Sequence, residues 1–87
     1  MVVRIPGLLR SYTNGAENVE IGEVSVLGDA LDRLDGWFPG LRFRVVDEQG
    51  AIRPHIKMFV DGELARGLET SVAGAGELML VGALSGG

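Results

Sequence analysis

One segment of this chain has the residue spacing of an amphipathic helix, and it constrains what the other segments can form. Leu27, Leu31 and Leu34 recur at helical spacing, which places them along one side of a helix. We expect this helix to begin after Ser25, which can serve as its N-cap, and to end near Gly36. A helix with one apolar side must cover an apolar surface, and in 87 residues the remaining short segments have to supply it.

The remaining apolar segments have the pattern of short β-strands. Strands are expected at residues 2–5, 17–21, 55–61 and 77–81. A further short strand is expected at Phe43 and Val45-Val46, whereas residues 63–75 are expected to be irregular apart from one helical turn. One helix across a mixed sheet of four to five strands is an α+β arrangement of the β-grasp type. In this plan the first and last strands can pair in parallel at the centre of the sheet.

Composition excludes several classes of function. The formal net charge of -4 disfavours a nucleic-acid binder, because such a protein needs a cationic face toward phosphates. The chain has no cysteine, which removes disulfides and thiolate catalysis and suits a cytoplasmic protein. His55 is the only histidine, so no metal site is expected. No apolar run is long enough to cross a membrane.

Several stretches, in this order, match a known family pattern. They are Ile5-Pro6 with Leu9-Arg10, Val26-Leu27-Gly28 with Leu31 and Leu34, Phe38-Pro39-Gly40-Leu41, the segment from Arg53 to Gly62, and the ending Ala83-Leu84-Ser85-Gly86-Gly87. With these residues the chain resembles the ThiS/MoaD family of ubiquitin-like sulfur carriers. Within that family it is most similar to the longer carriers that work with a cysteine synthase.

This resemblance implies a ubiquitin-like β-grasp domain over residues 1–82 and a flexible C-terminal tail over residues 83–87. Gly87 would be adenylated by a ubiquitin-activating-like partner that consumes ATP, and then converted to a thiocarboxylate. Leu84, Ser85 and Gly86 would thread into the partner's site, where glycine offers no side chain to obstruct the reacting carbon. The chain itself would then be a carrier and not an enzyme, with no bound cofactor and no metal.

The resemblance leaves the use of the sulfur open. A sulfur-accepting synthase would take it for cysteine or molybdopterin biosynthesis, or with less support for thiamine. A molybdopterin role would make the chain the small subunit of a synthase complex. Two other readings remain: a protein modifier conjugated to lysine through Gly87, and a non-catalytic β-grasp interaction domain.

The alternation of residues in two strands predicts a surface for a partner. Glu77 is expected to face solvent, so Met79 and Val81 should share its side of the last strand. Lys57 sets the phase of the earlier strand in the same way and places Phe59 outward. If these strands are neighbours, Phe59, Met79 and Val81 form an exposed apolar patch near the tail, which is a candidate docking surface.

Overall fold

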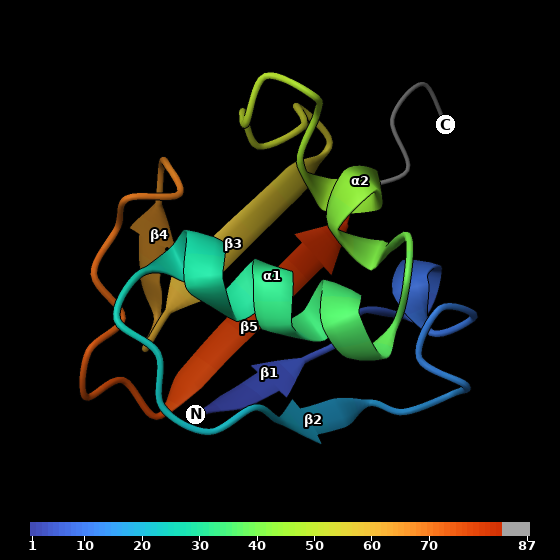
Figure 1. Ribbon diagram of the computed structural model, residues 1–87, viewed down its shortest axis with the longest axis horizontal. Coiled ribbons are helices and arrows are strands. Elements are labelled where there is room, and N and C mark those ends of the chain that lie inside the picture. The colour runs from blue at the N-terminus through green and yellow to red at the C-terminus, as the bar shows by residue number, and fades with distance from the viewer. Residues whose placement is uncertain (83–87) are drawn as a thin grey trace.

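The leucine-rich segment forms helix α1 (Leu27–Trp37) in the computed structural model, which describes residues 1–82 (Figure 1). Its buried side consists of Leu27, Ala30, Leu31 and Leu34. The expectation that Ser25 caps the helix is wrong, because Val26 occupies the N-cap position without a side-chain hydrogen bond. The first helical amides instead donate to the backbone carbonyls of Thr70 and Leu68, both at 2.9 Å. The loop that precedes β5 therefore takes over the role of a capping side chain.

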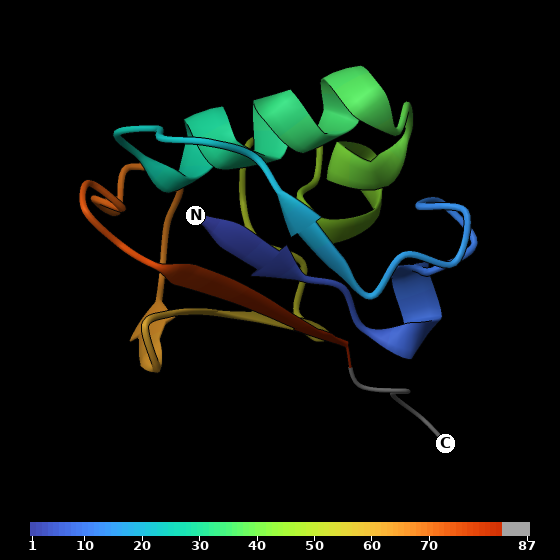
Figure 2. The ribbon, with the colours of Figure 1, turned by 90° about the horizontal axis from the view of Figure 1, so that it is seen from below.

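Five short strands form one sheet beneath this helix (Figure 2). They are β1 (Val2–Arg4), β2 (Asn18–Glu20), β3 (Ile56–Val60), β4 (Glu63–Ala65) and β5 (Glu77–Gly82). Their order across the sheet is β2-β1-β5-β3-β4. Strands β1 and β5 pair in parallel, and the other neighbouring strands pair antiparallel. The predicted β-grasp plan, with the first and last strands at its centre, is confirmed.

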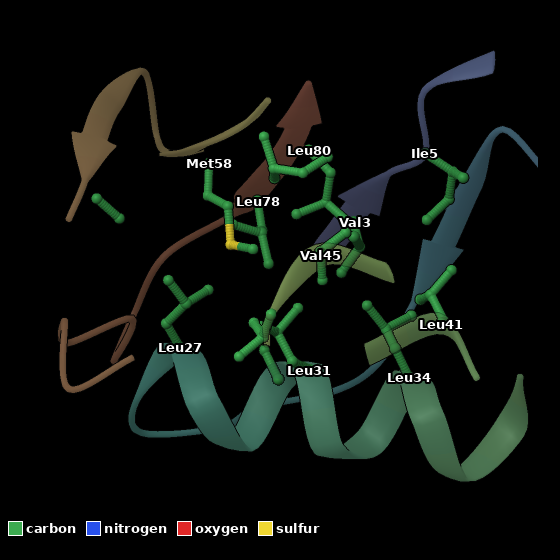
Figure 3. Close-up of a cluster of buried hydrophobic side chains, with 14 of the residues drawn as sticks. Val3, Ile5, Leu27, Leu31, Leu34, Leu41, Val45, Met58, Leu78 and Leu80 are labelled. Carbon is green, nitrogen blue, oxygen red and sulfur yellow. The ribbon is translucent and has the colours of Figure 1, made fainter. Parts of the chain in front are cut away.

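The hydrophobic core lies between α1 and the inner face of the sheet (Figure 3). From the sheet side, Val3, Met58, Leu78 and Leu80 reach toward the leucines of α1. Full burial of one such side chain contributes roughly 1.5–3 kcal/mol. Leu78 and Leu80 alternate with the less buried Met79, which confirms the predicted phase of the last strand. Met58 and Phe59 show the same alternation in β3.

The segment expected as a strand at Phe43 and Val45-Val46 is instead helix α2 (Leu41–Val45), so that expectation is wrong. Its apolar residues Leu41 and Val45 are four positions apart and both fully buried, as one side of a helix requires. The chain becomes extended only at Val46, which forms an isolated bridge with Ile52.

Asp35 explains why a helix forms here. Its Oδ1 accepts hydrogen bonds from the backbone amides of Gly40 and Arg42, each at 3.1 Å. A carboxylate at a helix N-terminus satisfies amides that have no partner within the helix. The neighbouring Asp32 pairs with the Arg42 guanidinium at 3.0 Å. The carboxylates of Asp32 and Asp35 on α1 thus hold α2 in place.

Residues 63–75 are also more regular than expected, because they begin with strand β4. Asp61 and Gly62 have φ angles of 47° and 87° and join β3 to β4 as a two-residue hairpin. The Asp61 carboxylate also accepts hydrogen bonds from the amides of Gly76 and Glu77 at 3.1 and 3.0 Å. The tip of this hairpin is therefore attached to the start of β5.

We predict that Asp35→Ala lowers the free energy of unfolding by about 1–2 kcal/mol, the usual cost of losing a capping side chain. The surface variant Glu48→Ala is the control, with an expected change within about 0.5 kcal/mol. Urea unfolding followed by circular dichroism measures both. Equal stabilities of the two variants would contradict the role assigned to Asp35.

Candidate functional site

Strand β5 places the start of the tail at one end of the sheet. It is flanked by β1 on one side and β3 on the other, so both of its edges are paired. Gly82 is its last residue and pairs with Ile56, the first residue of β3. The predicted tail residues Leu84, Ser85, Gly86 and Gly87 follow in sequence and lie outside the described residues. Their roles stay predictions.

The three residues of the predicted patch lie on the face of the sheet that points away from α1. Phe59 and Met79 are direct cross-strand partners, and Val81 is the partner of Lys57. The exposed fraction of Met79 is 36%, and Phe59 and Val81 are half-buried. Strand pairing thus brings together three residues from two distant segments of the chain.

Leu64 extends this surface and was missed by sequence reasoning. It pairs with Phe59 across the β3–β4 hairpin and is 42% exposed. The Asp61-Gly62 turn was the signal that could have found it, because a two-residue hairpin fixes which residues face each other. We define the outer patch as Phe59, Leu64, Met79 and Val81.

Charged groups border the outer patch on the β1 side. Arg4 lies opposite Met79, and its guanidinium forms an ion pair with Glu77 and a 3.5 Å hydrogen bond to Asn18. Both members of the ion pair are partly exposed, so the pair contributes little to the stability of the fold. It marks the edge of the outer patch. An apolar centre with a polar rim is the usual anatomy of a protein–protein interface.

Leu8 is a second apolar residue at the tail end that the sequence did not predict. It belongs to the short 3-10 helix η1 (Gly7–Leu9) and is 42% exposed. A Cβ on Gly82 would lie 2.7 Å from the Leu8 Cδ2 atom, so glycine allows the two segments to approach closely. No spacing in the sequence signals this contact, because it joins the two ends of the domain.

The loop between α2 and β3 is held by Asp47. Its Oδ1 accepts hydrogen bonds from the amides of Ala51 at 3.0 Å and Gln49 at 2.9 Å. The hydrogen bond from Ala51, helped by the bond from Gln49 and by nearby Arg53, lowers the pKa of the Asp47 carboxyl below its ordinary value. This loop leads directly into β3 and so fixes the strand end that pairs with Gly82.

No group of three His, Cys, Asp or Glu side chains that could hold a metal ion occurs among residues 1–82. His55 is half-buried just before β3, near Phe43 and Arg53. Neither helix of the described part has the length and apolar character needed to cross a membrane.

Comparison with known proteins identifies relatives of similar size. The chain is 39% identical to small archaeal modifier protein 1 of Haloferax volcanii over 69 residues, which cover 79% of this chain and 78% of that protein. A chain of the Amycolatopsis orientalis BexX/CysO complex is 28% identical, with a TM-score of 0.87 and coverage of 99% and 98%. CysO of Mycobacterium tuberculosis, described as an antigen, is 25% identical with a TM-score of 0.86 and coverage of 95% and 98%. A scan of protein-family models finds no match.

The fold and these relatives define the class as ubiquitin-like β-grasp proteins. The chain belongs to the ThiS/MoaD-like family of ubiquitin-like sulfur carriers and modifiers, and within it to the CysO-like type. The expectation that it acts as a carrier or modifier accords with this membership. The membership does not by itself assign a pathway.

We predict that Asp47 makes the fold more sensitive to acid. A carboxyl whose pKa is lowered by folding stabilises the fold above its ordinary pKa, and this contribution is lost as the pH falls through the lowered value. The free energy of unfolding should therefore fall more steeply between about pH 5 and pH 2 in the wild type than in Asp47→Asn. Glu48→Gln is the matched control and should follow the wild type. Parallel curves for the wild type and Asp47→Asn would refute this assignment.

Proposed function

We propose that this chain is a sulfur carrier whose C-terminal carboxylate, on Gly87, is activated by a partner enzyme and converted to a thiocarboxylate. Family membership supports the proposal, and so does the position of β5. The strand that leads to the tail is central and paired on both sides, so the tail begins from the most firmly held part of the sheet. A carrier needs this combination of a fixed body and a reactive end.

The proposed chemistry takes place in two steps. A carboxylate oxygen of Gly87 attacks the α-phosphorus of ATP, pyrophosphate leaves, and an acyl adenylate forms. A hydrosulfide ion from the sulfur source then attacks the acyl carbon, AMP leaves, a proton is released, and the C-terminus becomes a thiocarboxylate. Gly86 and Gly87 have no Cβ, which lets the end of the chain enter a narrow site on the partner. The partner supplies ATP and the catalytic side chains, and the carrier supplies the acyl group.

The outer patch is the proposed docking surface for the adenylating enzyme. Phe59 and Met79 are adjacent on neighbouring strands, and Leu64 widens the apolar area across the hairpin. A partner that covers this area would bury apolar side chains that now face solvent, which favours association. Two residues of the patch, Met79 and Val81, lie on the strand that leads to Gly82, so one partner can bind the patch and reach the tail.

The receiving synthase is proposed to belong to cysteine or molybdopterin biosynthesis, with thiamine biosynthesis less supported. Likeness to CysO in two solved structures favours the cysteine type of carrier. In a molybdopterin pathway the chain would be the small subunit of a synthase complex.

A second candidate is conjugation to proteins, and one observation favours it. The relative with 39% identity is a modifier protein by name. An activated Gly87 carbonyl can react with a lysine amine instead of a sulfur donor, and the product is then an isopeptide-linked conjugate. The two functions share the adenylation step and differ in the nucleophile that follows it.

We predict that incubation with ATP, a sulfur source and the adenylating enzyme of the same organism converts the chain to a thiocarboxylate. Intact-mass spectrometry should show the gain that corresponds to one oxygen replaced by sulfur. A variant that lacks Gly87 should show no gain, because it lacks the terminal residue that the partner recognises. The control is a second carrier on which the enzyme preparation is active.

Two results would contradict sulfur transfer. An unchanged mass with an enzyme that is active on the control carrier would exclude this chain as its substrate. High-mass conjugates on a denaturing gel, lost without Gly87 and formed in place of the thiocarboxylate, would assign the chain to the modifiers.

We predict that Phe59→Asp leaves the fold nearly intact but weakens binding to the adenylating enzyme. Phe59 lies on the outer face, so the cost to the free energy of unfolding should stay near 1 kcal/mol. Loss of a central apolar residue from an interface should raise the dissociation constant about tenfold or more. Trp37→Asp is the matched control, because Trp37 is 52% exposed at the end of α1, away from the patch.

Calorimetric titration and thermal unfolding of both variants test this prediction. Severe unfolding of Phe59→Asp would show that Phe59 belongs to the core. Equal weakening by Trp37→Asp would show that the outer patch is not the docking surface.

A further inference from the structure

Four of the eight lysine and arginine side chains have cationic N–H groups without a partner among residues 1–82. None of the four has a carboxylate oxygen within 4.0 Å. Their one hydrogen bond to the backbone in this part of the chain is donated by the Arg53 Nε atom. These four are Arg44, Arg53, Lys57 and Arg66. The others are engaged: Arg4, Arg10 and Arg42 in ion pairs, and Arg33 with the carbonyls of Ile21 and Glu23. The available positive charge is therefore restricted to a few positions.

These four cations line two adjoining grooves. Arg53, Lys57 and Arg66 surround a groove of about 220 Å³ whose walls include the apolar Ile52 and Leu64. Arg44 and Arg53 line a second groove of about 190 Å³ together with Phe43 and His55. Arg53 belongs to both grooves and connects them. We define the cationic collar as Phe43, Arg44, Arg53, His55, Lys57 and Arg66.

Helix α2 and the start of β3, which contribute collar residues, lie near the end of β5 (Figure 1). Lys57 pairs with Val81, next to the last residue of β5. Arg66 follows Ala65, the partner of Met58, and therefore lies at the same end of the β3–β4 pair as Lys57. The collar also adjoins the outer patch, because Leu64 lines the first groove.

Two of the guanidinium groups are held in place before any partner binds. The Arg53 Nε donates a 2.7 Å hydrogen bond to the Phe43 carbonyl, and its guanidinium carbon lies 4.6 Å from the centre of the Phe43 ring. The Arg44 guanidinium lies 5.8 Å from the centre of the Tyr12 ring. Stacking restricts these side chains, so less conformational entropy is lost when a ligand binds.

The composition of the collar is typical of an interface. Phe43 is 56% exposed, the largest exposed fraction among the large apolar residues at positions 1–82, yet it carries a stacked arginine. Aromatic and arginine side chains are enriched at the residues that contribute most to protein–protein binding. A side chain that serves the core would be buried, whereas Phe43 is exposed.

Charges that face the collar do not neutralise it. Asp47 lies near Arg53, but its Oδ1 is already bound to the amides of Gln49 and Ala51. Glu23, Asp29 and Asp32 line a separate groove with Arg33. The net charge of -4 repels polyanions such as nucleic acids at long range, whereas the local cations attract carboxylates at short range. This combination favours an acidic protein surface.

We propose that the cationic collar is a docking site for an acidic, partly apolar segment of a protein that acts on the tail. Carboxylates of that segment pair with Lys57, Arg66 and the free N–H groups of Arg53. Its apolar residues contact Phe43 and the groove walls. The identity of the partner as a tail-processing protein rests on the proposed function, whereas the preference for an acidic peptide does not.

The first test is an NMR titration of the isotope-labelled chain with a short peptide of glutamate and phenylalanine. Amide shifts should change at residues 43–44, 53–57 and 66. The double variant Lys57→Gln/Arg66→Gln should raise the dissociation constant about fivefold, as expected for two exposed ion pairs. The control Ser25→Asp/Ala73→Asp changes the formal net charge by the same amount in a groove beside Glu23 that shares no residue with the collar, and it should bind as the wild type does.

Three results would overturn the proposal: no shift changes at the collar, equal loss of affinity in both double variants, or tighter binding of a short oligonucleotide than of the peptide. The second test uses the adenylating enzyme. The collar variant should raise KM for the chain about fivefold with kcat unchanged, and an unchanged KM would exclude the collar from this complex. No turnover of the wild type would contradict the proposed function instead, while the peptide titration still decides the collar.

Discussion

The parallel pairing of β1 with β5 is the contact on which the rest of this structure depends. It joins the first and last strands of the domain and connects the β1–β2 pair to the β3–β4 hairpin. Helix α1 covers the strands from above, so its leucines meet Leu78 and Leu80 of β5 in one core. Loss of this pairing would separate the β1–β2 pair from the three-stranded β5-β3-β4 part of the sheet, and an isolated two-stranded pair is at best marginally stable. The tail begins from the same central strand.

Sequence reasoning succeeded where a local pattern is sufficient. Lys57 and Glu77 each mark the solvent side of a strand, and this fixes Phe59 and Met79 on one face once the strands are neighbours. The leucine spacing of α1 is equally local, and the helix forms where it was expected. Together these features placed most of the sheet and the core, and brought the residues of the candidate patch to one face.

Contacts between distant segments account for the features that the sequence did not predict. Phe43 and Val45 are common in strands, but the Asp35 carboxylate caps the amides that begin α2. The N-terminus of α1 needs no capping serine, because the loop that precedes β5 accepts its amide hydrogen bonds. Strand β4 has Leu64 as its one large apolar residue, so its sequence shows no repeated alternation. The cationic collar combines residues from α2, β3 and the segment after β4, and it becomes visible only in the folded chain.

In the proposed function, the folded body binds partners and the C-terminus reacts. The outer patch and the cationic collar meet at Leu64 on the edge strand β4, which β3 separates from β5, and they differ in chemistry. Apolar contacts supply affinity, whereas the charges select partners of opposite sign and guide their orientation. Such a division suits a protein that presents one tail to more than one enzyme.

The central claim is that the Gly87 carboxylate reacts with ATP on a partner enzyme. The measurement that tests it most directly is ATP–pyrophosphate exchange by the adenylating enzyme, with the free acid compared with a chain amidated at Gly87. The account predicts exchange with the free acid and none with the amide, although both bind the enzyme equally. Equal exchange with both forms, or none with the free acid once binding is shown, would contradict it.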